Sequence, residues 1–253
     1  MSSTPVKTDA FLLRTVDYRD SDRILTLLTA NKGKISALAR GARKSQKRYG
    51  GALIPFAQME VVLEKGRGKL LHIKEAELTT ANEGIAKDLR RLGASSYIIE
   101  IIRESIPENL PDQPIFRLLE TALPLLATIA LEDVQKAVIA IVLKILSYSG
   151  IAVGLSNCSA CDTTVPPGRP VLFHPGRGGV ICTPCGGGPI RLEAETIDSL
   201  IRLRDTSLDK LSTVPVSPEA ASGADEALAT FVEHHLGRRL KTRAFLHPAV
   251  TTT

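Results

Sequence analysis

The chain has 253 residues, a length that accommodates two domains, and it carries a formal charge of +5. No stretch approaches the roughly 18 consecutive apolar residues of a transmembrane helix. The first residues lack the basic and apolar segments of a secretory signal. Composition therefore argues against a membrane protein, and we expect a cytoplasmic one.

The first 80 residues show the pattern of short β-strands. Apolar residues alternate in part over 9–18, 23–29 and 35–40, and residues 57–78 have the pattern of a hairpin that bends at residues 66–68. Five short strands favour a small closed barrel, because closure removes exposed strand edges. We predict a barrel domain over residues 1–80.

The apolar spacing then changes to three and four residues, which indicates helices. The predicted helical segments are 84–106, 113–129, 131–150, 193–205 and 217–240. The third is apolar over a wide face and is expected at the centre of a bundle. Pro124 should kink the second, and Ser217 should cap the last. We predict a helical domain over residues 81–253, with a cysteine module embedded at 155–191, and an α+β fold class.

The module holds every cysteine of the chain, as two Cys-x-x-Cys pairs: Cys158, Cys161, Cys182 and Cys185. In a reducing compartment this spacing favours a metal over disulfides. Four thiolates complete a tetrahedral shell and leave no place for water, so we predict one structural zinc per chain. A thioredoxin-like dithiol would need only one pair, and an iron–sulfur cluster is the less favoured alternative.

Four further residues of the module are weaker candidates for roles around the metal. His174 is a minor candidate for a fifth ligand. Arg169, Arg177 and Arg191 either offset the negative charge of a zinc–thiolate centre or are solvated loop residues. The sequence leaves both readings of the arginines open.

Positive charge is concentrated near the N-terminus. No acidic residue occurs between Asp22 and Glu60, and the same stretch contains Arg23, Lys32, Lys34, Arg40, Arg43, Lys44, Lys47 and Arg48. Such a patch is expected for a polyanion partner, and a solvated face is the alternative.

Signs of catalysis are missing from the sequence. There is no phosphate-binding Gly-x-x-x-x-Gly-Lys-Ser/Thr segment and no nucleophile motif. Asp17, Asp20 and Asp22 are better explained as a polar loop between strands than as a metal site. We expect a protein that is not an enzyme.

Several segments resemble one bacterial family, the RecO recombination mediators. The resemblance is carried by residues 17–44, which match its N-terminal signature, by 142–161 and 172–185 around the two cysteine pairs, and by 234–246 at the C-terminal helix. It extends in order over nearly the whole chain.

The resemblance implies an N-terminal OB-fold barrel, a helical domain and a zinc module. It implies binding of single- and double-stranded DNA, annealing of complementary strands, and help to RecA in displacing single-strand-binding protein (SSB). RecR, and often RecF, are the implied partners in this RecF pathway of DNA repair, and the location is the cytoplasm, at the nucleoid. Together with the charge pattern, it makes these the expected DNA-binding residues: Lys32, Lys34, Arg40, Arg43, Lys44, Lys47 and Arg48.

Two finer expectations follow from the same resemblance. The basic stretch offers only Tyr49 and Phe56 for base stacking, which favours phosphate contacts over stacking. The acidic C-terminal tail of SSB is expected in an apolar groove of the helical domain, and Arg90, Arg91 and Arg103 are candidates for its rim.

A nuclease or a transcription factor is the competing class. A nuclease would need a carboxylate cluster for magnesium, and a transcription factor would carry its basic residues on a recognition helix. Annealing without ATP or magnesium would discriminate, because a nuclease degrades DNA only with its metal.

Overall fold

The computed structural model of the chain describes residues 5–44, 46–66 and 70–246, and it describes residues 46 and 47 by their backbone alone. The chain divides into two compact units. The barrel unit comprises Met1–Ile85 and Ile106–Pro124, and the helical unit comprises Ala86–Ser105 and Leu125–Thr253. The division into domains 1–80 and 81–253 stays a prediction.

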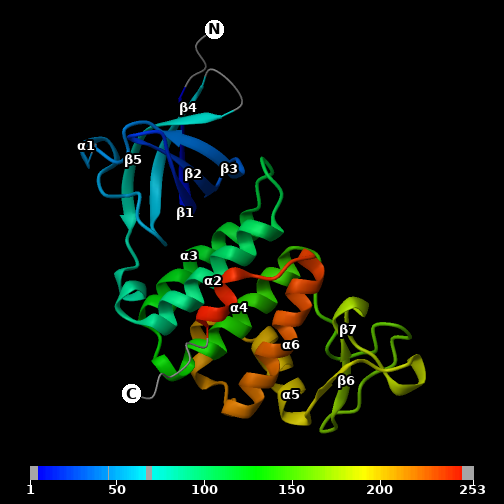
Figure 1. Cartoon of the computed structure of the whole chain (residues 1–253). Helices are drawn as coiled ribbons and strands as arrows, with labels where there is room; N and C mark the ends of the chain where they lie inside the picture. Colours follow the sequence, from blue (N-terminus) through cyan, green and yellow to red (C-terminus); the bar gives the residue numbers. More distant parts are fainter. Residues whose placement is uncertain (1–4, 45, 67–69, 247–253) are drawn as a thin grey trace. The chain divides into compact units, whose positions relative to one another are not determined.

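Five strands form a closed barrel in the barrel unit (Figure 1). In the order in which they follow one another around the barrel, they are β1 (Val6–Tyr18), β2 (Asp22–Thr29), β3 (Gly33–Ala39), β5 (Leu71–Thr80) and β4 (Gln58–Lys65). Neighbours are antiparallel except β3 and β5, which close the barrel by a short parallel pairing. The predicted five-strand barrel is confirmed, although part of the predicted bend at 66–68 lies outside the described residues.

Strict alternation in β3 shows how the sequence builds this barrel. Gly33, Ile35, Ala37 and Ala39 are buried, and the residues between them are half-buried. Side chains of a strand point to opposite faces in turn. Every second residue of β3 therefore faces the barrel interior, where Leu27 and other apolar residues of β2 meet it.

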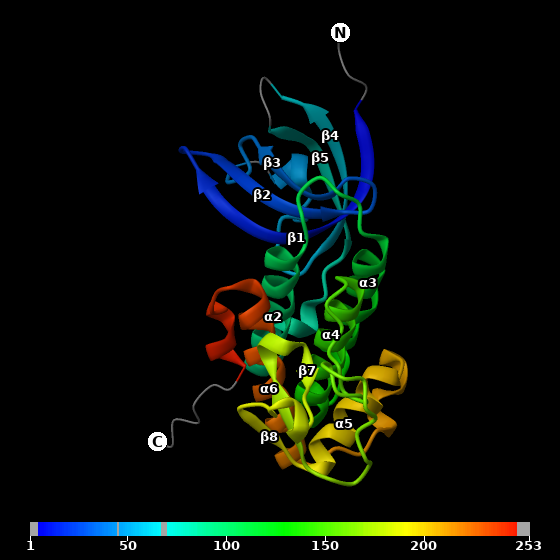
Figure 2. The ribbon, with the colours of Figure 1, turned by 90° about the vertical axis from the view of Figure 1, so that its right-hand side faces the viewer.

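The β1–β2 hairpin continues past the barrel core. The register of β1 shifts between Leu12 and Arg14, and every residue from Arg14 to Asp20 is exposed. Figure 2 shows β1 and β2 side by side up to this tip. The hairpin therefore offers strand residues that the core does not use.

Residues 106–124 pack on the barrel although they follow the first helix in sequence. The rings of Phe11 and Phe116 lie 5.1 Å apart, and the Asn109 amide donates to the Lys34 carbonyl over 2.8 Å. The unit thereby includes the first part of α3 (Gln113–Thr128), which contains Pro124. These long-range contacts have no local pattern that sequence analysis could detect.

Four longer helices form the helical unit: α2 (Leu89–Ser105), α4 (Val134–Tyr148), α5 (Ala194–Asp205) and α6 (Pro218–Leu236). The central position expected for the third predicted helix fits α4, which contacts α2, α5 and α6. The helix predicted over 84–106 is shorter, because residues 83–87 form a separate 3₁₀ turn. The Asp88 carboxylate accepts the Arg90 and Arg91 amides and so starts α2 at Leu89.

The C-terminal segment is fastened to α2 by a buried carboxylate. Glu100, with 2% of its surface exposed, accepts hydrogen bonds from the backbone amide and the hydroxyl of Thr242. Nearby, Arg243 forms an ion pair of 2.6 Å with Asp225. None of the helices in the described part of the chain has the length and apolar character needed to cross a membrane.

Candidate functional site

A three-stranded sheet carries the cysteine module. Its strands, in the order β7-β6-β8, are β7 (Gly179–Val180), β6 (Val171–His174) and β8 (Ile190–Leu192). Phe173 of β6 is fully buried, and its ring lies 6.0 Å from that of Phe231 on α6. Apolar packing therefore joins the sheet to the helices independently of the cysteines.

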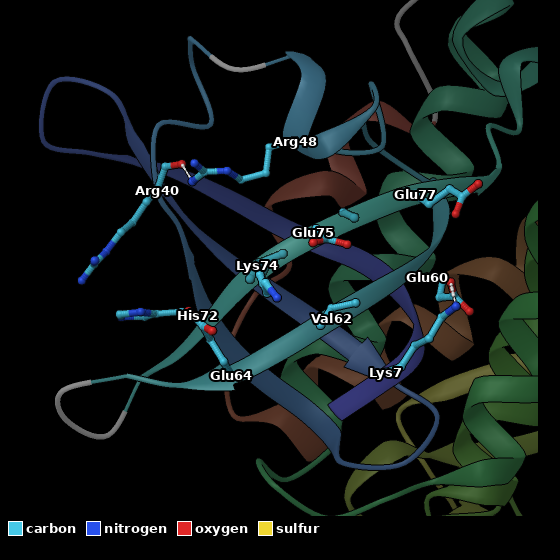
Figure 3. A pocket seen from close by; sticks show the side chains of 12 residues that line it. Lys7, Arg40, Arg48, Glu60, Val62, Glu64, His72, Lys74, Glu75 and Glu77 are labelled. Atoms are coloured by element: carbon cyan, nitrogen blue, oxygen red, sulfur yellow. Dashed lines mark hydrogen bonds and ion pairs between the residues drawn. The ribbon is translucent and has the colours of Figure 1, made fainter. Parts of the chain in front are cut away.

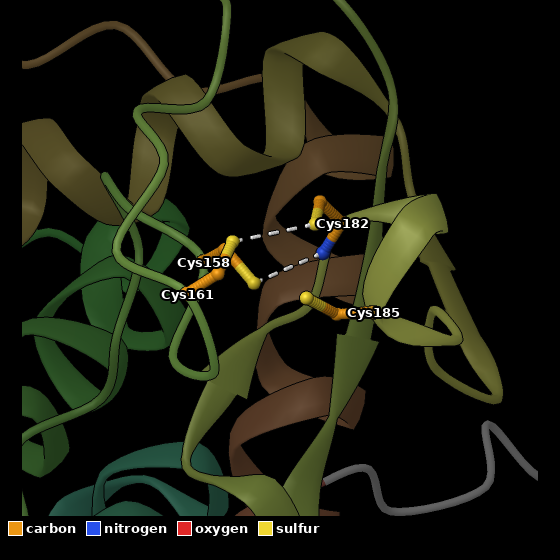
Figure 4. Close-up of side chains that lie close together, drawn as sticks. All are labelled: Cys158, Cys161, Cys182 and Cys185. Atoms are coloured by element: carbon orange, nitrogen blue, oxygen red, sulfur yellow. Dashed lines mark hydrogen bonds between the residues drawn. The ribbon is translucent and has the colours of Figure 1, made fainter.

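The four cysteines converge from two loops (Figure 4). Their sulfur atoms all lie within 4.8 Å of one another. Cys158 is buried and Cys161 is exposed, while Cys182 and Cys185 are half-buried. The structure thus brings together all four residues that the spacing predicted as metal ligands.

This geometry suits a metal ion better than a disulfide. All four cysteines are free, and the sulfurs of Cys161 and Cys182 are 3.7 Å apart. A disulfide would require about 2.05 Å. A tetrahedron with metal–sulfur bonds of about 2.3 Å has edges of about 3.8 Å. The observed separation therefore matches ligands placed around one ion.

The pKa values of the four cysteine thiols also favour the binding of a metal cation. Hydrogen bonds from the backbone amides of Cys182 and Ala160 lower the pKa of the Cys158 thiol to about 6. Hydrogen bonds with the thiols of Cys182 and Cys161 raise the pKa of Cys185 to about 12. One thiolate forms readily and the last is strongly opposed, so the fully ionised set needs a positive ion among the sulfurs.

Glycines shape the second cysteine loop. A Cβ atom on Gly188 would lie 2.3 Å from the Phe173 carbonyl oxygen, and Gly186 has a φ of +97°. The Arg177 guanidinium donates to the Cys185 carbonyl over 2.8 Å. Only glycine has room at position 188 and is unstrained at position 186. The hydrogen bond from Arg177 further stabilises the same loop.

The other candidates of the module have different surroundings. Arg191 forms a surface ion pair with Glu193, and Arg169 is exposed. Among the described residues, the group of possible metal ligands contains the four cysteines and not His174. The Nδ1 atom of His174 is buried without a hydrogen-bond partner.

The predicted DNA-binding residues fall into two groups on the barrel unit. Lys32 and Lys34 are half-buried near the start of β3, and the backbone of Lys34 forms an isolated parallel bridge with the backbone of Glu108. Arg40 follows the other end of β3. Six residue steps at about 3.3 Å each separate Lys34 from Arg40, a distance of about 20 Å. The charge pattern of the sequence therefore assigned to one patch residues that lie at opposite ends of β3.

Residues 40–48, named here the basic loop, form the second group, and the segment runs into the short helix α1 (Gln46–Tyr49). Arg40, Arg43, Lys44 and Arg48 are exposed, whereas the side chain of Lys47 lies outside the described residues. The loop is held by the preceding hairpin, since the Gly41 amide donates to Asp22 Oδ1 over 2.8 Å.

Contacts within the barrel unit reduce the charge of this loop only in part. Arg43 lies 4.0 Å from Asp17, and Arg48 donates to the Arg40 carbonyl. Both arginines stay largely exposed. The loop therefore keeps an accessible positive surface.

A mixed-charge hollow of about 790 Å³ lies beside β4 and β5 (Figure 3). Its charged lining comprises Glu60, Glu64, Glu75 and Glu77 together with Lys7, Lys74, Arg40 and Arg48. Lys7 and Glu60 form an ion pair of 2.6 Å. The four carboxylates balance the four cations, so the interior of this hollow offers no net positive charge to a nucleic-acid backbone, and only cations at its rim remain available.

The two rings in the basic stretch are poorly placed for stacking. Tyr49 is 2% exposed, and its hydroxyl donates to the Arg40 carbonyl over 2.8 Å. Burial raises the pKa of this phenol. Phe56 is half-buried in a left-handed turn conformation, with a φ of +63°. Tyr49 is therefore a structural residue of the basic loop.

Sequence reasoning missed an exposed ring. Tyr18, at the end of β1, is 39% exposed, and the Arg19 guanidinium lies 5.1 Å from its ring centre. Its position on the hairpin follows from the strand register, which the sequence did not reveal.

Cations of the helical unit are mostly engaged by other groups. Arg91 donates to the Leu126 carbonyl, and Arg103 pairs with Glu100 and Glu104. Arg90 is exposed. Of the three residues predicted for the rim of an SSB groove, Arg90 is the most accessible.

Comparisons with known proteins identify relatives of both the barrel region and the helical region. Residues 1–82 match the family described as "Recombination protein O N terminal", and residues 86–244 match "Recombination protein O C terminal". The chain is 40% identical over 245 residues to the DNA repair protein RecO of Anaeromyxobacter sp. (strain K), covering 95% of each chain. It is 35% identical over 243 residues to the DNA repair protein RecO of Geobacter sulfurreducens, covering 96% of this chain and 97% of the relative. The DNA repair protein RecO of Myxococcus xanthus is 34% identical over 238 residues, with 94% and 95% covered.

Proposed function

The chain belongs to the RecO family of DNA repair proteins, and from this premise we propose that it is a recombination mediator without enzymatic activity. It binds DNA through the barrel unit, anneals complementary strands and helps to load RecA onto single strands coated with SSB. Its partners are RecR, the acidic tail of SSB and, in this pathway, RecF. It acts in the cytoplasm at the nucleoid.

The observation that carries the DNA-binding proposal is the exposed basic loop on a closed five-strand barrel. Phosphates are bound mainly by charge, and small barrels of this kind bind oligonucleotides on their outer surface and loops. Lys32 and Lys34 are a secondary contact in this proposal, because they are half-buried and about 20 Å from the loop.

In the helical unit, we assign one zinc ion to the four cysteines. Four soft ligands in a tetrahedral arrangement are the preferred zinc shell, and a closed shell leaves no site for substrate. The ion therefore holds the module together and takes no part in a reaction.

SSB would dock on the same unit through Arg90, and calorimetry with the isolated SSB tail peptide at low salt tests that contact.

A salt titration tests the DNA site. The variant Arg43→Ala, Lys44→Ala, Lys47→Ala, Arg48→Ala should bind a fluorescent single strand more weakly than the wild type. Each lost phosphate contact flattens the slope of log affinity against log salt by about 0.7, so four contacts account for about 2.8. The effect should be equal for all base sequences, because phosphates carry no sequence information.

Arg239→Ala with Lys241→Ala provides a control, since both residues are exposed cations of the helical unit. It removes two charges, so a DNA site there would flatten the slope by about 1.4. An unchanged slope in the loop variant, with a flatter slope in this control, would move the DNA site to the C-terminal segment. Annealing of complementary strands without ATP or magnesium then tests the mediator function. Metal-dependent degradation instead of annealing would favour a nuclease.

A further inference from the structure

The outer face of the β1–β2–β3 sheet carries an apolar row that the barrel core does not use. Val16 lies opposite Ile24, and Ile24 lies opposite Leu38. Residues opposite each other in antiparallel strands share a face. The neighbouring residues Leu25 and Ala37 belong to the barrel core, so the row faces outward. We call Val16, Ile24 and Leu38 the outer row.

Tyr18 continues this surface toward the tip of the hairpin. It lies two residues beyond Val16 on the same strand, and therefore on the same face. Tyr18 is 39% exposed and Val16 is 42% exposed, while Ile24 and Leu38 are half-buried. A planar ring and a partly exposed apolar row thus lie next to each other.

Positive charge surrounds the surface. Arg14 is exposed on the same strand face, two residues before Val16. The Arg19 guanidinium lies 5.1 Å from the centre of the Tyr18 ring. Arg40 follows β3 directly and is also exposed. A ligand of this surface should therefore combine flat apolar groups with negative charge.

Nearby carboxylates do not cancel this charge. Asp17 accepts a hydrogen bond of 3.1 Å from Arg23, and Asp22 accepts the Gly41 amide. Asp20 remains exposed at the turn. Two of the three acids at the tip of the hairpin, Asp17 and Asp22, are thus held by groups of the barrel unit itself.

Single-stranded DNA has the chemistry that this surface fits. Its bases present flat faces, which a duplex hides by stacking, and its phosphates are negative. Proteins that bind single strands combine aromatic side chains for base stacking with a basic path for the backbone. The sheet face formed by the second and third strands, with the loop between the first and second strands, is the usual nucleic-acid surface of small barrels of this type.

We propose that Tyr18 stacks on a base of single-stranded DNA, with the outer row beside it and with Arg19 and Arg40 at the adjoining phosphates. The proposal rests on the proposed DNA-binding function and adds base contacts to a site otherwise explained by charge. It gives the protein a preference for single strands that the basic loop alone does not supply.

Tryptophan fluorescence provides a direct test, because the chain contains no tryptophan. Tyr18→Trp places a single probe on the hairpin. Tyr148→Trp is the matched control, since Tyr148 is 50% exposed on α4 of the helical unit. Binding of an oligothymidine of about 16 nucleotides, the upper site size for one such barrel, should quench the first probe and leave the second unchanged.

Affinity measurements separate stacking from charge. Stacking on an aromatic ring contributes between about five-fold and about 150-fold in affinity per base. Tyr18→Ser should therefore weaken oligothymidine binding at least about five-fold, while Tyr18→Phe keeps wild-type affinity. The affinity for an abasic oligonucleotide of the same length should be the same in wild type and in Tyr18→Ser. Circular dichroism checks that the variants fold.

The possible results separate the two proposals. If the wild type binds no DNA, the proposed function fails and this inference fails with it. If the wild type binds DNA with a salt dependence but Tyr18→Ser binds equally well, only the stacking inference is wrong. Quenching of the Tyr18→Trp probe by a protein partner and not by oligothymidine would also overturn it, in favour of a protein-binding face.

Discussion

Removal of the metal should open the two cysteine loops and leave the helices folded. The loops are joined by few protein contacts. The Gly154 amide donates to Gly178, the Val180 amide donates to Gly154, and the Ser159 amide donates to Val180, each over 2.8 Å. These bonds and the cysteine cluster connect the segment around residue 158 to the segment around residue 182.

The magnitudes show that these hydrogen bonds cannot hold the loops alone. A backbone hydrogen bond contributes about 1 kcal/mol net. These three, together with the three that the Cys158, Asp162 and Val165 amides donate within residues 156–165, therefore give about 6 kcal/mol. Ordering the ten residues 156–165 costs at least about 10 kcal/mol of backbone entropy. Structural zinc supplies about 10–16 kcal/mol in small modules, which is enough to offset that cost. The burial of Phe173 against α6 does not depend on the metal and should keep β6 attached.

Hydrogen exchange with and without a chelator measures this effect. Peptides that cover 156–165 and 181–188 should lose protection, while those from α4 and α6 should keep it. Cys161→Ser should behave like the chelated protein. Thr163→Val is the matched control, because it removes only the hydroxyl that contacts Cys161 Sγ at 3.2 Å.

Elemental analysis should find about one zinc per chain, as four ligands complete one shell. Unchanged protection in protein shown to be metal-free would refute the reasoning, because the loops would then be stable without the ion. Loss of protection in every helix would refute it as well, since the effect would no longer be local.

Two other substitutions have definite expected outcomes. Glu100→Gln weakens the bonds to Thr242 and should lower the free energy of unfolding by about 2 kcal/mol near neutral pH, measured by urea denaturation. Burial opposes ionisation of Glu100, but the Thr242 hydrogen bonds outweigh it and lower its pKa. The ionised Glu100 carboxylate therefore contributes its full stabilisation above the ordinary glutamate pKa of about 4.3. That stabilisation is lost as the pH falls through the lower pKa of the folded protein. The variant, which lacks the carboxylate, should therefore lose less stability on acidification than the wild type. Gly33→Ala should destabilise the barrel by more than about 1 kcal/mol in thermal unfolding, because its Cβ would lie 1.9 Å from the Leu110 carbonyl oxygen at a φ of +67°.

Much of the fold was predictable because its signals are local. The alternation of buried residues in β3 and the three- and four-residue spacing of the helices are each contained in one element. The convergence of the four cysteines was predictable because two Cys-x-x-Cys turns at this spacing have few other structural uses. In these cases one stretch of sequence determines the geometry.

The contacts of residues 106–124 with the barrel were not predictable in this way. Phe116 meets Phe11, and Asn109 meets Lys34, across long intervals of sequence. The basic residues were found by counting charges, which does not show that Lys34 and Arg40 lie at opposite ends of β3. Residues that are close in sequence can lie about 20 Å apart when they stand at the two ends of an extended strand, as Lys34 and Arg40 do.

Tyr18 shows why the sequence pointed to phosphate contacts alone. A count of aromatic residues in the acid-free stretch finds Tyr49, which the structure buries, and leaves out Tyr18, which precedes that stretch. Only strand register places Tyr18 on the same face as Ile24 and Leu38. The distribution of charge determines which surface of the barrel attracts DNA. The strand register determines whether an aromatic ring such as Tyr18 lies on that surface, where it can stack on a base. Both properties belong to the barrel unit alone, so the proposed DNA surface requires no contribution from the metal module.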